Sequence, residues 1–211
     1  MANIKLTKNG LKAQKDSLKM YVRYLPTLTL KKQQLQSEIR TIELRAREVR
    51  EKRAQLEKEF AKWIAVFGEQ EAFSSDMVVV RNIRKKEGNI AGVTIPIYEG
   101  ADFSRGDYDL YSKPLWIDLA AVKMEQTLSL DLEADVLDEQ VRLLEHELRV
   151  TTQRVNLFEK VKIPETKANI KVITVYLGDQ QVAAVVRGKI SKKNLEIAAQ
   201  KAELEAQGGA K

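Results

Sequence analysis

Two stretches of the chain carry apolar residues at intervals of seven, a pattern that predicts long coiled-coil helices. The first stretch has two rows, offset by three and four residues: Leu28, Leu35, Ile42, Val49, Leu56 and Trp63 in one, and Leu11, Leu18, Leu25, Ile39, Ala46, Phe60 and Phe67 in the other. Lys32 and Arg53 interrupt the second row, as polar residues do where they set register or face a partner. Pro26 should kink the helix without ending it, because the seam continues in phase. The pattern predicts a long N-terminal helix within residues 1–70.

The last third of the chain repeats this pattern. One row is Leu130, Leu137, Leu144, Thr151 and Phe158, and the other is Ala134, Val141, Leu148 and Val155. Beyond an interruption at Lys162 and Pro164, we expect the rows to resume at Val172 and Tyr176. Asp118 can cap the start of the helix and Gly178 can close its end. We therefore predict a second long helix over 118–178, followed by a basic, partly disordered extension over 179–211.

The period changes between the two helices. The β-branched runs 78–80 and 90–97 flank a charged bend at 84–89, which predicts a β-hairpin, followed by a loop over 98–113. The expected fold is mainly α: a long antiparallel two-helix coiled coil with a small β-hairpin insert, residues 71–117, between the helices. Because an isolated hairpin is marginal in water, its apolar residues should pack on the helices or on a partner. The candidate contact residues are Val79, Ile90, Val93 and Ile95.

The net charge of +6 is unevenly distributed. Residues 1–30 carry six bases and one acid, residues 118–150 three bases and nine acids, and residues 151–193 nine bases and three acids. An antiparallel pair would place the acidic stretch beside the arginine-rich stretch 40–62 and bring the two basic stretches together. This basic end is either a solvated helix face or a surface for an acidic protein partner, and it has no nucleic-acid docking motif. Its candidate contact residues are Lys8, Lys12, Lys15, Arg154, Lys162 and Lys171.

The sequence argues against catalysis. The one histidine, His146, lies at a polar heptad position and should be solvent-exposed. We find no Gly-rich phosphate loop or other short catalytic motif, and without cysteine there is no thiolate metal site. We expect no cofactor and no metal. No apolar run approaches the roughly 20 residues that span a bilayer, so direct membrane insertion is not expected.

Three segments resemble the D subunit of the V-type/A-type rotary ATPases, the central-stalk rotor shaft. The most specific is 154–164, Arg-Val-Asn-Leu-Phe-Glu-Lys-Val-Lys-Ile-Pro, which is continued by 169–173. The hairpin segment 88–96 and the opening helix, with Leu6-Thr7-Lys8 and the run 30–35, support it by order and spacing. The mostly uncharged segment 180–186 departs from the family pattern, which is often strongly charged there.

The resemblance implies a non-catalytic shaft that transmits torque in a V/A-type ATPase or ATP synthase. Its paired termini would enter the head of catalytic and regulatory subunits. Its hairpin end would meet the small central-stalk subunit and the membrane-side adaptor subunit. The implied location is cytoplasmic, peripheral to a membrane-bound ATPase complex. From the residues alone, a stand-alone coiled-coil scaffold or tether, or more weakly a nucleic-acid-binding helical hairpin, stays open.

Overall fold

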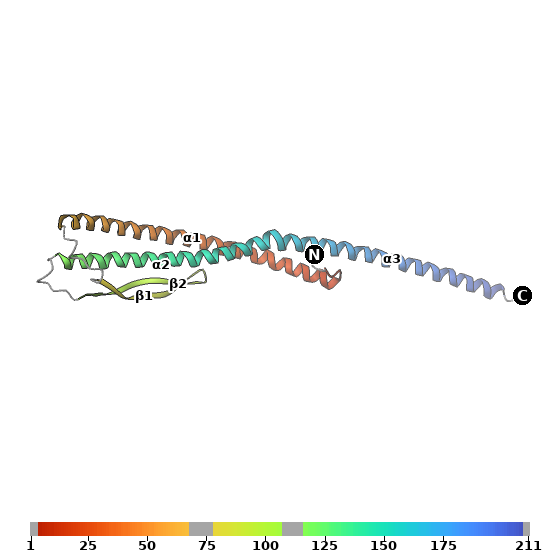
Figure 1. Cartoon of the computed structure of the whole chain (residues 1–211). Coiled ribbons are helices and arrows are strands. Elements are labelled where there is room, and N and C mark those ends of the chain that lie inside the picture. The colour runs from red at the N-terminus through yellow and green to blue at the C-terminus, as the bar shows by residue number, and fades with distance from the viewer. Residues whose placement is uncertain (1–3, 68–77, 107–115, 209–211) are drawn as a thin grey trace. The chain divides into compact units, whose positions relative to one another are not determined.

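A computed structural model of the chain describes residues 4–67, 78–106 and 116–208, with side chains described up to 62 in the first range and 201 in the last. Its elements, shown in Figure 1, are α1 (Lys8–Phe67), β1 (Val78–Ile90), β2 (Val93–Arg105), α2 (Ile117–Asn156), the π-helical turn η3 (Leu157–Lys162) and α3 (Ile163–Gly208). The chain divides into two compact units. We call Leu28–Arg154 the hairpin unit, and Met1–Thr27 with Val155–Lys211 the terminal unit. The side chains of Trp63 and Phe67, and residues 107–113 of the predicted loop with Pro114, lie outside the described part of the chain.

In the hairpin unit, α1 and α2 run antiparallel around a narrow apolar core. The core follows the seam read from the sequence: Leu35, Ile39, Ile42, Ala46 and Val49 from α1, and Ala134, Leu137 and Leu144 from α2. Both heptad rows of each helix contribute, so the predicted coiled-coil seam is confirmed here. Burying apolar side chains contributes about 25 cal/mol per Å², which makes this seam the main stabilising element of the unit.

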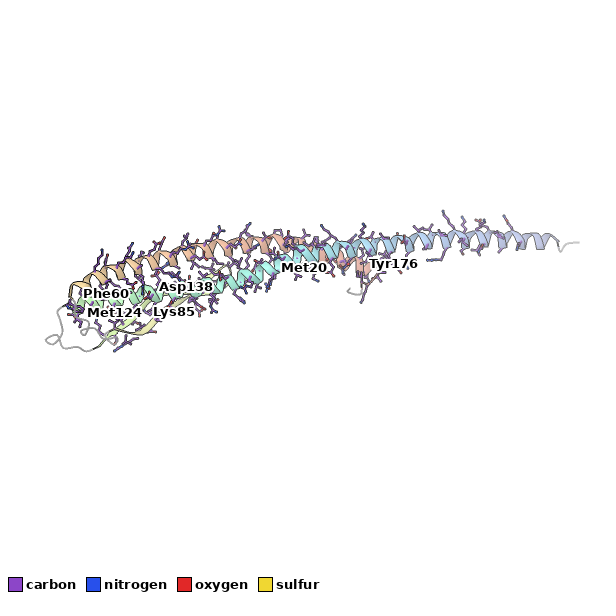
Figure 2. All side chains as sticks on the ribbon, turned by 45° about the horizontal axis from the view of Figure 1, so that its top comes forward. Met20, Phe60, Lys85, Met124, Asp138 and Tyr176 are labelled. Atoms are coloured by element: carbon purple, nitrogen blue, oxygen red, sulfur yellow. The ribbon has the colours of Figure 1, made fainter. Side chains whose placement is uncertain are left out.

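The β-hairpin lies along the α1–α2 pair (Figure 1). Ile95 of β2 is buried in the seam core, and Ile90, Ala91 and Val93 pack against it. A second cluster, formed by Val78, Ile117 and Ala121, gathers partly buried residues such as Met124, which Figure 2 places with Phe60 toward one end of the pair. The hairpin therefore covers one side of the α1–α2 core. This explains why Gln140, a polar residue of α2, is buried: its amide donates to the Pro96 carbonyl.

The predicted hairpin is confirmed, but its predicted bend was wrong. Strand β1 continues through 84–89, and Ile90 pairs with Val93, so the turn consists of Ala91 and Gly92. Both have positive φ, 51° and 81°, as the tight turn of a twisted hairpin requires, and the Gly92 amide donates to Asn89 Oδ1 over 3.0 Å. The part of the predicted loop from 98 to 105 is strand as well, paired with 78–85.

Helix α1 continues through Pro26, as the unbroken seam predicted.

In the terminal unit, α1 starts behind an N-cap: Thr7 Oγ1 accepts from the Gly10 amide at 3.1 Å. Gly10 also allows a close approach of the preceding backbone, because a Cβ there would lie 2.3 Å from the Lys5 carbonyl oxygen. This contact places Ile4 and Lys5 beside the first turn of the helix.

The prediction that the second helix ends at Gly178 was wrong. The helix continues to Gly208. A terminating glycine takes a left-handed φ at the position after the helix. Among the described glycines, positive φ occurs at Gly92 and Gly100, so Gly178 keeps the helical conformation. The Ala-, Glu- and Lys-rich stretch that follows has good helix propensity. The predicted extension is therefore helical through 208, while 209–211 lie outside the described residues.

The predicted phase after Pro164 was also wrong. The rows were expected at Val172 and Tyr176, yet these are 53% and 39% exposed, whereas Thr166 and Ile173 are buried. The cause is η3, in which the Ile163 amide donates to the Phe158 carbonyl, five residues back. A π-turn adds one residue to the helix, so each later position on the buried face shifts by one. The heptad that passes through Leu144 and Thr151 therefore resumes at Thr166 and Ile173.

Candidate protein-interaction site

Ion pairs connect the two helices of the hairpin unit. Lys31 Nζ lies 2.7 Å from Glu147 Oε1, and Arg45 lies 2.8 Å from Glu133 Oε1. Between these two pairs the residue number rises by 14 along α1 and falls by 14 along α2, which is the antiparallel register. Arg50 with Asp138 forms a further pair. The expected pairing of the acidic stretch with the arginine-rich stretch is confirmed.

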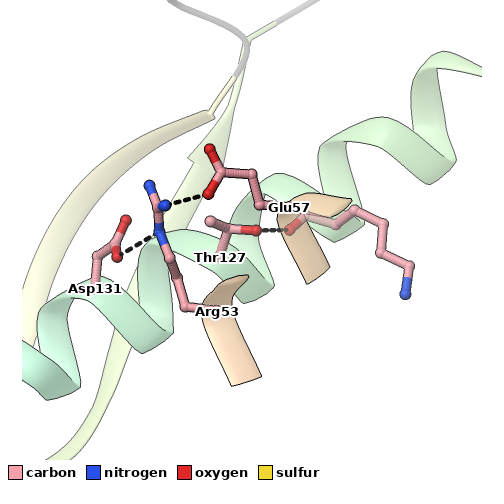
Figure 3. A network of polar contacts seen from close by, with 5 residues as sticks. Arg53, Glu57, Thr127 and Asp131 are labelled. Carbon is pink, nitrogen blue, oxygen red and sulfur yellow. Dashed lines mark hydrogen bonds and ion pairs between the residues drawn. The ribbon is translucent and has the colours of Figure 1, made fainter. Parts of the chain in front are cut away.

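Arg53, the residue that interrupts the seam, belongs to the same set. Its Nε donates to Asp131 Oδ1 over 3.1 Å, and it also pairs with Glu57 one turn further along α1 (Figure 3). Thr127 Oγ1, on the adjacent turn of α2, donates to the Lys123 carbonyl at 2.9 Å. A polar residue in a coiled-coil seam fixes register when its partners are specific. Arg53 therefore holds α1 and α2 in one alignment.

Two carboxyl groups of α2 have a lowered pKa: Glu147, from the cross-helix pairs, and Glu139, from a pair within α2. The hydrogen bond from Lys31, with help from nearby cationic charge, holds the pKa of Glu147 below its ordinary value of 4.5. On the exposed face of α2, the hydrogen bond from Arg142 lowers the pKa of Glu139 and in turn raises the pKa of Arg142. These are structural ion pairs, since none of them lines a cavity that the structure describes.

The predicted basic residues of α1 lie together. Lys8, Lys12 and Lys15 are exposed, and Lys19 continues their spacing of three and four residues. Such spacing places all four on one side of the helix, and we call them the basic stripe. The opposite side of α1, with Gly10, Ala13, Gln14, Ser17 and Tyr21, faces α3 and lines a cavity of about 340 Å³.

The remaining basic candidates are not all grouped with this stripe. Lys171 is exposed on α3, in the same unit. Lys162 is half-buried at the cavity, where its Nζ lies 3.5 Å from Glu165 Oε2. Arg154 is exposed but belongs to the hairpin unit, so the structure does not bring it together with the others within one unit.

The apolar hairpin candidates differ in burial. Ile95 is buried in the seam core, and Ile90 and Val93 pack against it, so their side chains hold the hairpin on the helices. Val79 is exposed, as is Ile97 on the other strand. A partner contact of the hairpin stays a prediction, and Val79 is the candidate whose side chain is available for one.

The sequence interpretation missed an apolar row on α3. Val172, Val175, Val182, Val186 and Ile190 are all large, apolar and exposed. Their spacing puts them on one side of the helix, opposite the side that carries Thr166 and Ile173. We call them the outer apolar row. Their heptad-like spacing was the available signal, but the assumed phase assigned Val172 to the inner seam.

The described residues offer little for chemistry. His146 is exposed on α2, as predicted. Within the described ranges, no group of three or more His, Asp and Glu side chains could hold a metal ion. Among the helices that the structure describes, none is long and apolar enough to cross a membrane.

The class of protein defined by these features is an antiparallel coiled coil with a hairpin docked on one helix pair and exposed basic and apolar rows on another. The family model for the D subunit of ATP synthase matches residues 10–193. The chain belongs to this family. The D subunit of the V-type ATP synthase of Borreliella burgdorferi is 49% identical over 195 residues, which cover 92% of this chain and 96% of that protein. Those of Chlamydia muridarum and Chlamydia pneumoniae are 34% and 32% identical, again over 92% of this chain and over 97% and 94% of theirs.

Proposed function

We propose that this chain is the central rotor shaft of a V-type ATP synthase and transmits torque between the nucleotide-processing head and the membrane rotor. The observation that carries the proposal is the family match along 10–193, which spans both helix pairs and the hairpin. The shaft itself is non-catalytic, and the nucleotide sites belong to the head. Its location is cytoplasmic, peripheral to the membrane-bound complex.

The contacts between α1 and α2 in the hairpin unit support this role. A shaft must not let one helix slide along the other under load. The seam core of Leu35, Leu137 and Leu144 resists separation, and the cross-helix pairs of Lys31, Arg45 and Arg53 resist sliding. Exposed ion pairs contribute little stability one by one, but several along one interface favour a single register.

The surface of the terminal unit supports insertion into a protein ring. An α-helix with apolar residues on two opposite sides is typical of one enclosed by protein. On α3, Ile173 packs inward while the outer apolar row faces away from α1. The catalytic and regulatory subunits of the head are the proposed partners of this row and of the basic stripe. Diffuse charge can hold a turning surface without deep docking.

The hairpin unit supplies the other proposed contacts. The small central-stalk subunit and the membrane-side adaptor subunit would bind it, with exposed Val79 and Ile97 at the hairpin surface. Both strands of a two-stranded sheet are edge strands, so a partner could also pair with the hairpin backbone.

Coupling measurements test the proposal. In the assembled complex, reconstituted in vesicles, a core-disrupting pair Leu35→Ala with Leu144→Ala should leave ATP hydrolysis by the head largely intact while ion pumping falls. The matched control is Leu44→Ala with Leu119→Ala, because these two leucines are exposed on the same two helices. If hydrolysis and pumping fall in parallel, the chain acts on catalysis itself and the shaft role is wrong. If the chain does not co-purify with the head at all, the scaffold alternative replaces it.

A further inference from the structure

The α3 helix carries two alternative faces that could pack against α1. In the described structure the inner face consists of Thr166, Ile173 and Leu177, one polar and two apolar residues spaced seven and four apart. One residue earlier, Glu165, Val172 and Tyr176 repeat the same spacing and composition. Tyr176 is labelled on α3 in Figure 2. This second face is the one that an uninterrupted heptad from Leu144 and Thr151 would turn toward α1.

The difference between the two faces is one residue, and η3 supplies that residue. In the π-turn the Ile163 amide reaches back five residues to Phe158. If the turn became α-helical, α3 would rotate by about 100° and move by about 1.5 Å along its axis relative to α1. We propose that η3 is a register switch, which lets α3 pack on α1 through either Thr166 and Ile173 or Glu165 and Val172.

The opposing surface of α1 can accept both faces. Gly10, Ala13 and Ser17 are small, and the cavity of about 340 Å³ between them and α3 leaves room for side chains to exchange. Well-packed cores instead oppose such a change, because each side chain fits one site. The residue with the highest cost of burial, Glu165, already lines this cavity together with Lys5 and Lys162. A charge that enters a partly buried site near cations is less costly than an isolated one.

Pro164 biases the switch toward the described register. Proline has no amide hydrogen, and its ring opposes the carbonyl four residues earlier in an α-helix, here that of Lys160. Lys160 lies inside η3, where the wider turn relieves the clash. The register that contains the π-turn is therefore the major state. The register in which the turn is α-helical is the minor state. The switch belongs to this chain alone and does not depend on the shaft function.

Cysteine cross-linking in the full chain tests the switch, because the native sequence has no cysteine. Gln14 and Asn169 line the cavity from opposite helices, so the pair Gln14→Cys with Asn169→Cys reports the described register. Gln14→Cys with Ala168→Cys reports the alternative register, in which Ala168 takes the place of Asn169. Under mild oxidation, we expect the second pair to cross-link at on the order of 1–10% of the rate of the first, as for a minor state in fast exchange.

Two changes at the π-turn, one inside η3 and one in the first turn of α3, give opposite expectations. Deletion of the exposed Val161 removes the extra residue and leaves only the described register. The cysteine pair at Gln14 and Asn169 should then keep its cross-linking rate, and the pair at Gln14 and Ala168 should lose most of its cross-linking. Pro164→Ala removes the bias and should raise the rate of the Ala168 pair. If that rate does not fall on deletion, or does not rise in Pro164→Ala, the proposal is overturned. Circular dichroism checks that helix content is kept, and deletion of exposed Leu157 replaces that of Val161 if it is not.

Discussion

The rings of Tyr21 and Phe158 pack against each other with their centroids 5.2 Å apart and their planes tilted by 40°. Phe158 is the last predicted seam position that keeps the original heptad phase, and it is also the acceptor residue of the π-turn. Tilted aromatic pairs at this separation are favourable. The contact therefore anchors α1 to the second helix at the point where the phase changes.

Phe158→Ala should weaken the terminal unit. Because Phe158 is half-buried, we expect a loss of about 1–2 kcal/mol in unfolding free energy from lost apolar burial and ring contact. Urea unfolding followed by circular dichroism measures it. The control is Tyr24→Ala, which removes an exposed aromatic ring from α1 in the same unit. Equal losses in the two variants would mean that the Tyr21 contact contributes nothing specific.

Leu144→Ala should be among the most costly substitutions in the hairpin unit. Leu144 is 0% exposed within the seam core, so truncation leaves a cavity and should cost about 2–5 kcal/mol. Leu44→Ala changes the same side chain at a position that is 59% exposed, and it should stay within about 0.5 kcal/mol of wild type. Chemical unfolding of both variants checks the difference, and similar values would contradict the assigned core.

The seam could be predicted from the sequence because heptad periodicity is a local property of each helix. Leu35, Ile42 and Leu144 were assigned from spacing alone, and the antiparallel pairing followed from the connecting insert. The phase of α3 could not be predicted this way. It depends on one extra residue in η3, and a π-turn leaves the apolar spacing on either side unchanged. Both Val172 and Ile173 are apolar, so composition did not decide between them.

The candidate interaction residues show a similar limit. Spacing predicted that Lys8, Lys12 and Lys15 share an exposed side of α1, and the structure places them there. For the hairpin, sequence could not distinguish Ile95, which packs on the helices, from Val79, which does not. That distinction depends on which side of the hairpin packs on the helices. It also depends on the position of the turn, which is at Ala91 and not in the charged segment 84–89, where the sequence predicted it.

Glu147→Gln should change the acid sensitivity of the hairpin unit. The Lys31 hydrogen bond lowers the pKa of Glu147 in the folded chain, so the unfolded chain binds more protons below pH 4.5. Its contribution is therefore complete above about pH 4.5 and is lost as the pH falls through the lower folded value. Both side chains are partly exposed, so the effect should be below about 1 kcal/mol. Wild type should lose more stability than the variant from pH 5 to pH 3, with Glu145→Gln as control. A difference that grows toward low pH would contradict this sign.

Substitutions at Ile95 and Val79 should separate packing from partner binding in the hairpin. Ile95→Ala removes a buried side chain and should cost about 2–4 kcal/mol of unfolding free energy. Val79→Asp affects an exposed side chain and should change stability little, but it should weaken binding of the small stalk or adaptor subunit. Calorimetry with the isolated partner measures the binding, and Arg81→Gln, at an exposed position on the same strand, makes the same change in net charge as a control. Unchanged affinity of the Val79 variant would remove the hairpin from the proposed contacts.

The basic stripe should contribute to assembly through charge rather than through fold stability. Lys8→Gln, Lys12→Gln and Lys15→Gln together remove three positive charges from exposed positions, so helix content should be unchanged while assembly with the ATP synthase head weakens. Because the attraction is electrostatic, wild-type assembly should itself weaken as ionic strength rises, and the triple variant should depend less on salt. Native gel electrophoresis of the reconstituted complex over a salt series measures both effects.

The control replaces Lys52, Lys58 and Lys62 with Gln, which makes the same charge change at exposed positions in the hairpin unit. Equal loss in both triple variants would indicate a general effect of net charge, and no loss in either would remove the stripe from the interface.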